Sequence, residues 1–173
     1  MVTSPSKWRS SRRERRAAPA SLARVFDEIV DAAGAESPLW GGALREVNDR
    51  VREPVFSSLA PSLYALGLET IYEGYLVHYG RSRLFAPPDR DTAVLLGDYL
   101  YAHGLVRIAE TGDVEAVGEL AELISRCAQL RAEGVDGDGQ EWVATSSSLG
   151  VGAVSPDGEV VAAALAAHAR HVG

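Results

Sequence analysis

Residues 91–133 read DTAVLLGDYLYAHGLVRIAETGDVEAVGELAELISRCAQLRAE, and this stretch predicts two helices joined by a short turn. The apolar positions of the first helix recur at helical spacing and are Ala93, Val94, Leu96, Tyr99, Leu100, His103 and Val106. Ala93, Gly97 and Gly104 also form a strip of small residues, along which a neighbouring helix could approach closely. Gly112 is expected to end this helix, and Asp113 to cap the next one.

The second helix carries one continuous polar stripe opposite an apolar face. The stripe alternates spacings of four and three residues and consists of Glu115, Glu119, Glu122, Arg126, Gln129 and Glu133. Further helices are predicted at residues 22–33, 42–52 and 61–79. The pattern therefore predicts a single all-α domain, a helical bundle over residues 21–173, preceded by a disordered basic arm at residues 1–20.

Charge is distributed unevenly between the arm and the domain. Six basic residues and one glutamate give residues 1–16 a net charge of +5, which leaves −12 for the rest of a chain whose total is −7. An acidic domain argues against nucleic acid as a partner. No apolar run reaches the ~20 residues that a membrane span needs, and no leader is recognisable, so a cytoplasmic location is expected.

Residues 94–102 (VLLGDYLYA) and the turn TGD at residues 111–113 resemble the middle of the trans-polyprenyl diphosphate synthases. Residues 142–154 (WVATSSSLGVGAV) and 159–173 (EVVAAALAAHARHVG) resemble the next two core helices of that family, so the resemblance covers about residues 60–173. It implies an all-helical bundle similar to an incomplete isoprenoid synthase fold.

The chain departs from these enzymes at the positions that perform catalysis. The family's first aspartate motif is replaced by Glu69 and Glu73, whose i, i+4 spacing could hold only a weak magnesium site. Ala144 and Thr145 stand where the family has a lysine and a threonine, and the second aspartate motif would lie beyond residue 173. Without these groups the charge of a leaving diphosphate is not stabilised.

The resemblance is therefore to the non-catalytic small subunit of heteromeric synthases. It implies a catalytic polyprenyl diphosphate synthase as partner, or a homodimer, with no cofactor of its own and any Mg²⁺ supplied through the partner. The family's dimer interface would correspond here to Gly97, Asp98, Leu100, Tyr101, Gly104, Val117, Ala121 and Ile124.

Three positions at the end of the third predicted helix are candidates for binding diphosphate. His78, Arg81 and Arg83 lie in or beside an arginine-rich connection, and arginine forms strong charge-assisted contacts with phosphate. Alternatively, these three residues belong to an ordinary solvent-exposed loop without a ligand. For Glu69 and Glu73, the alternative is that they form the one hydrated strip on an otherwise buried helix. Two other functions stay open: a degenerate prenyl-diphosphate-binding enzyme that uses the two glutamates with magnesium, and an unrelated helical interaction module.

Overall fold

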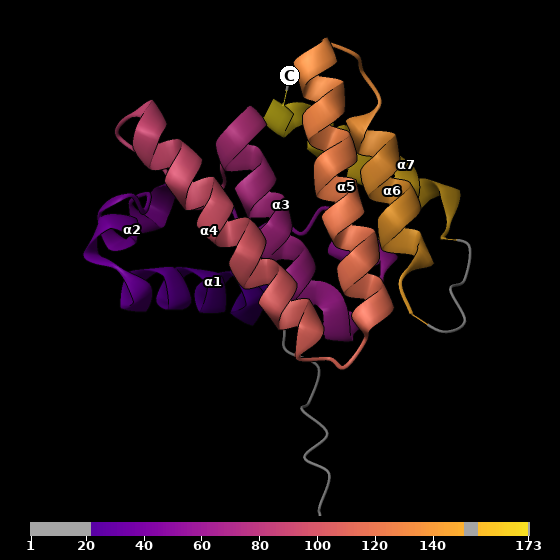
Figure 1. The fold of residues 1–173 in the computed structure, drawn as a ribbon, viewed down its shortest axis with the longest axis horizontal. Coiled ribbons are helices and arrows are strands. Elements are labelled where there is room, and N and C mark those ends of the chain that lie inside the picture. The colour runs from indigo at the N-terminus through magenta and orange to yellow at the C-terminus, as the bar shows by residue number, and fades with distance from the viewer. Residues whose placement is uncertain (1–21, 151–155, 173) are drawn as a thin grey trace, which may run out of the picture.

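The computed structural model describes residues 22–150 and 156–172, and Figure 1 shows their arrangement. The helices are α1 (Leu22–Glu36), α2 (Pro38–Gly42), α3 (Ala65–Tyr79), α4 (Arg90–Ala109), α5 (Val114–Glu133), α6 (Asp138–Ser148) and α7 (Gly158–Val172). Short 3₁₀ turns occur at Val47–Asp49, Ser57–Leu59 and Ser62–Tyr64. Within the described ranges there is no β-strand, so the all-α class is confirmed. The predicted arm lies outside these ranges.

Helix α3 is the centre of the bundle, with α1 and α2 to one side of it and α5, α6 and α7 to the other (Figure 1). Its residues from Gly67 to Leu76 are all buried, which is the reason for its nearly uniform apolar composition. One apolar cluster joins α3 to α5, α6 and α7. A second cluster joins it to α1, α4 and the connection before α4.

Four glycines allow α3 and α4 to cross closely. Gly67 lies against Gly104, and Gly74 lies against Gly97, so two pairs with a spacing of seven residues meet in antiparallel order. A Cβ atom on Gly104 would lie 2.5 Å from Cγ1 of Ile71 and 3.0 Å from the carbonyl oxygen of Gly67. The predicted strip of small residues is thus confirmed as a close helix contact, and its neighbour is α3 of the same chain.

The segment between α2 and α3 differs from the prediction. A helix over residues 42–52 was expected, but the helix there ends at Gly42 and is capped at its start by the Ser37 hydroxyl, which accepts a hydrogen bond from the Leu39 amide. Residues 43–51 instead run beside residues 83–86. The amides of Arg45 and Val51 donate to the carbonyls of Leu84 and Arg83, at 2.9 and 3.1 Å. Long-range backbone bonds therefore replace the local helix.

The turn between α4 and α5 follows the sequence closely. Asp113 caps α5 by accepting a hydrogen bond from the Ala116 amide at 3.0 Å, and Gly134 ends that helix in the left-handed conformation, with φ 65°.

Helix α6 starts at Asp138, four residues earlier than predicted. Among the described helices, none combines the length and apolar character needed to cross a lipid bilayer.

Candidate functional site

Glu69 and Glu73 of α3 form an ion network with Arg83, which the connection to α4 places beside them. Nη1 of Arg83 lies 2.8 Å from Oε2 of Glu69, and its Nε lies 2.9 Å from Oε2 of Glu73. All three side chains are buried, with exposed fractions of 0 or 1%. The two residues predicted to bind magnesium and one residue predicted to bind diphosphate are therefore brought together as partners of each other.

The remaining oxygen atom of each glutamate is also bonded. Oε1 of Glu69 accepts from the amides of Val55 and Ser57 and from the Ser57 hydroxyl. Oε1 of Glu73 accepts from the Leu84 amide at 2.8 Å and from the Ser82 hydroxyl. A magnesium site at Glu69 and Glu73 is not supported by this geometry, because donors within the chain already occupy the carboxylates. The network instead fixes two irregular segments to α3.

Arg83 is held in place by aromatic rings as well as by carboxylates. Its guanidinium carbon lies 5.1 Å from the ring centre of Phe26 and 5.0 Å from that of Tyr72. Burial acts against its charge, but Glu69 and Glu73 raise the pKa of Arg83 above its ordinary value. Arg83 is therefore a permanently charged residue inside the fold.

The three predicted diphosphate ligands do not lie together. His78 faces α4, where its Nε2 is 3.3 Å from Oδ1 of Asp98 and its ring stacks on Tyr101 at 5.1 Å. Arg81 is exposed, and its amide donates to the carbonyl oxygen of His171 in α7 at 2.7 Å. The structure thus groups Arg81 with Arg83 and places His78 elsewhere.

Arg81 and Arg83 share a pocket of about 260 Å³ with residues that the sequence analysis did not select. Its lining consists of Arg45, Asp49, Val51, Glu53, Arg81, Ser82, Arg83, Arg170 and His171. Arg45 and Arg170 stand far from residue 83 in the sequence, and no local pattern indicates that they meet. Backbone and side-chain bonds between these segments bring the four arginines around one space.

The predicted interface residues divide into three groups. Gly97, Leu100 and Gly104 are buried against α3, so their assignment to a surface is corrected to the core of the chain. Asp98 and Ala121 are exposed. Tyr101, Val117 and Ile124 are partly buried and pack against the apolar cluster around α3 and α5. The resemblance from which this interface was taken does not show which of these residues the chain's own helices cover.

A different set of apolar residues is exposed on α4 and α5. These two helices meet at their turn and splay apart beyond it (Figure 1). We call this set the outer face; its exposed members are Val94, Leu95, Ala102 and Val106 of α4 and Val114, Gly118 and Ala121 of α5. The exposed fraction is 56% for Leu95, 55% for Val106 and 82% for Val114. Val94 and Val106, which belong to the predicted apolar pattern, are therefore not enclosed by the described chain.

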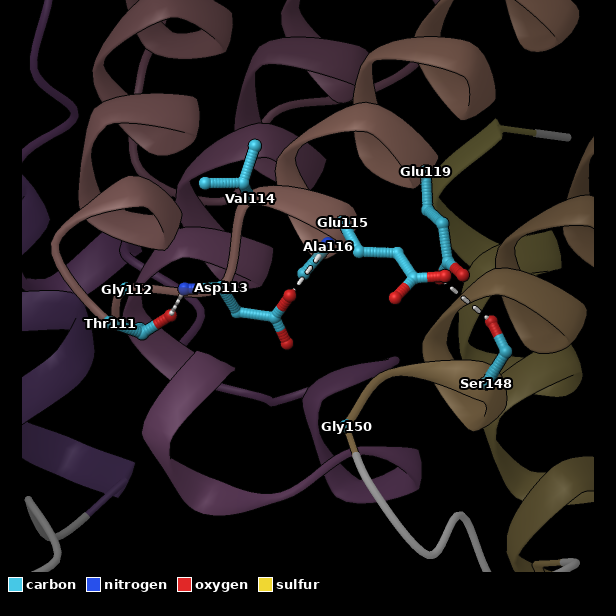
Figure 2. A pocket seen from close by; sticks show the side chains of 9 residues that line it. All are labelled: Thr111, Gly112, Asp113, Val114, Glu115, Ala116, Glu119, Ser148 and Gly150. Atoms are coloured by element: carbon cyan, nitrogen blue, oxygen red, sulfur yellow. Dashed lines mark hydrogen bonds between the residues drawn. The ribbon is translucent and has the colours of Figure 1, made fainter.

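Figure 2 shows a second pocket, of about 660 Å³, at the start of α5, with Asp113, Glu115 and Glu119 on its walls. Asp113 caps the helix and also accepts a hydrogen bond from the Tyr64 hydroxyl at 2.6 Å, which raises the pKa of Tyr64 to about 12. Glu119 accepts from the Ser148 hydroxyl at 3.1 Å. Asp113 and Glu119 thus stabilise the helix start and its contact with α6.

Comparison of the chain with protein-family models, with curated proteins and with solved structures gave no match.

Proposed function

We propose that this chain is a non-catalytic helical subunit that binds a partner protein through its outer face. The observation that carries the proposal is the exposure of Leu95, Val106 and Val114 on two adjacent helices, interspersed with alanine and glycine. Large apolar side chains exposed on a surface are typical of protein interaction sites when a partner covers them. Small residues between them would let a partner helix lie close to the backbone of α4 or α5.

The charges near the outer face indicate the chemistry of the partner. Asp98 of α4 and Glu115 and Glu122 of α5 are exposed acidic residues on the same two helices. A complementary partner surface would be apolar at its centre, with arginine or lysine side chains at its edge.

The partner that we propose is a catalytic trans-polyprenyl diphosphate synthase subunit acting in isoprenoid chain elongation. Support comes from the resemblance of residues 94–102 and 111–113 to that family, and from the position of these segments in α4 and in the turn that precedes α5. Glu69 and Glu73 hold Arg83, which agrees with a chain that leaves magnesium and the condensation step to its partner.

Reconstitution tests this function. The chain, a catalytic subunit with intact aspartate motifs, and their mixture would each be incubated with an allylic diphosphate, isopentenyl diphosphate and Mg²⁺. We expect elongated product from the mixture at a higher rate than from the catalytic subunit alone, and no product from the chain alone. The proposal would be contradicted if the isolated chain made product. It would also be contradicted if the rate and product length of the catalytic subunit were the same with and without the chain.

A helical interaction module unrelated to synthases is the second candidate, because the outer face would serve it equally well. A measurement of self-association distinguishes these two candidate functions. This second function would be favoured if the chain formed a stable homodimer through the outer face and did not bind the synthase subunit.

A further inference from the structure

Three segments that are distant in sequence build the pocket beside Arg83: residues 45–53, residues 81–83 and the end of α7. Backbone hydrogen bonds join them, from Arg45 to Leu84, from Val51 to Arg83, and from Arg81 to His171. The side chain of Arg45 adds a bond from its Nε to the carbonyl oxygen of Ser82 at 3.0 Å. The pocket walls are therefore held by the fold and not by exposed side chains alone.

Two nitrogen atoms of residues that line the pocket have no bonding partner within the part of the chain that the structure describes. Nε and Nη1 of Arg83 bind carboxylates and the Glu53 carbonyl, but its Nη2 has no acceptor, although the residue is only 1% exposed. Nε2 of His171, on the same pocket, is likewise buried and without a partner. A buried guanidinium nitrogen without an acceptor is costly, and it indicates a site where an acceptor binds.

The outer part of the pocket supplies further positive charge. Arg45, Arg81 and Arg170 surround it, against two acidic residues, Asp49 and Glu53. Glu53 pairs with Arg170 at 2.7 Å, but both side chains are about half exposed. Such a surface pair contributes little to stability, so an incoming anion can take the place of Glu53 beside Arg170.

We propose that this pocket binds a small phosphate-type oxyanion, either free phosphate or the phosphate group of a small ester. The tetrahedral oxygens of phosphate can accept from Nη2 of Arg83 and, in the tautomer that carries its proton on Nε2, from His171, while Arg81 and Arg170 neutralise its outer oxygens. The volume of about 260 Å³ lies below the ~300–1,000 Å³ of pockets for larger ligands, which favours a compact ligand.

The imidazole of His171 provides a spectroscopic reporter. Burial, and then the charge of Arg83, lower the pKa of His171 below 6.5. A bound phosphate places negative charge beside the ring and should raise that pKa. The pocket includes no residue of α4 or α5, so this inference is independent of the proposed partner surface.

Titration calorimetry with inorganic phosphate, at constant ionic strength, tests the site with three single variants. Arg81→Gln removes a charge at the pocket and should weaken binding roughly tenfold, as expected for one charged hydrogen bond. Glu53→Gln removes the acid that competes for Arg170 and should tighten binding. Arg90→Gln, an exposed arginine at the start of α4, is the matched control and should leave affinity unchanged.

A phosphate monoester in the same titration distinguishes the two ligand sources. Equal affinity assigns the site to the free anion, and tighter binding of the ester assigns it to a phosphorylated metabolite. Absence of saturable binding to either probe would overturn the inference. It would also fall if Glu53→Gln failed to tighten binding, if Arg81→Gln and Arg90→Gln had equal effects, or if phosphate left the His171 ring resonances unchanged.

Discussion

The inner and outer sides of α4 have similar small and aliphatic residues, but the inner side is buried and the outer side is exposed. On the inner side, Gly97 and Gly104 face α3 so closely that a methyl group would not fit. On the outer side, Ala102 and Val106 have no covering element within the described chain. Composition alone does not distinguish the two sides, because both follow the 3.6-residue period of a helix.

The inner and outer regions differ in how completely their side chains are packed and hydrogen-bonded within the chain. In the inner region, defined as α3 and the residues packed on it, glycines fit against backbone, and Glu69 and Glu73 bond with Arg83. The outer face has exposed apolar area and no such complementarity. We therefore expect substitutions inside to change the free energy of unfolding and substitutions outside to change association.

Removing the charge of Arg83 should have the largest effect. Arg83→Met leaves two carboxylates buried without their cation, which typically costs about 3–5 kcal/mol of the free energy of unfolding. Urea denaturation followed by circular dichroism measures this loss. Combining Arg83→Met with Glu69→Gln and Glu73→Gln should recover much of it, because the unpaired charges are gone. A loss of less than about 0.5 kcal/mol, typical of an exposed residue, would show that the network is not buried in solution.

Gly104→Ala should have the next largest effect. The added methyl group would meet the Ile71 side chain and the backbone of α3, and overpacking of this kind costs about 1–3 kcal/mol. Gly118→Ala on the outer side of α5 is the matched control, because nothing lies within 4 Å of its Cβ position. That change should stabilise the helix by roughly 0.5–1 kcal/mol. Equal effects at both glycines would remove the distinction between inner and outer sides.

A smaller, pH-dependent effect is expected from His78, an α3 residue whose side chain faces α4. Burial lowers its pKa below 6.5 in the folded chain, although Asp98 opposes this. The unfolded chain then binds the proton more readily, so stability should fall as the pH drops below about 6.5. His78→Phe cannot be protonated and should flatten this part of the curve relative to the unmodified chain. Identical pH profiles from denaturation at several pH values would contradict a buried imidazole here.

Ala102→Arg on the outer face should change stability least, within about 0.5 kcal/mol, because the side chain points into solvent. Thermal denaturation of the isolated chain measures this. A strong destabilisation would mean that α4 is enclosed on both sides and that the outer face does not exist as a surface.

Local patterns in the sequence predicted much of the fold. The all-α class, the cap at Asp113 and the close contact along Gly97 and Gly104 follow from periodicity and from single-residue preferences. The family resemblance assigned Gly104 to an interface, and helical periodicity could not correct this, because it shows that a face is apolar but not which element covers it. Residues 42–52 were misassigned as a helix because their backbone bonds reach residues some forty positions away.

The candidate site was predictable only in part. Arg81 and Arg83 were selected from their loop, and they do share a pocket. Their surroundings depend on tertiary contacts: Glu69 and Glu73 lie ten or more residues before Arg83, and Arg170 comes from the last helix. Charge pairing over such separations leaves no periodic signal in a single sequence.

The central claim, that the outer face binds a partner while the inner region forms the core, is tested most directly by sedimentation velocity. The unmodified chain, Ala102→Arg and the matched control Ala162→Arg, an exposed alanine of α7, would each be mixed with a catalytic polyprenyl diphosphate synthase subunit. We predict one faster-sedimenting complex for the unmodified chain and for Ala162→Arg, and separate components for Ala102→Arg. A complex that persists with Ala102→Arg, or separate components with the unmodified chain, would contradict the claim.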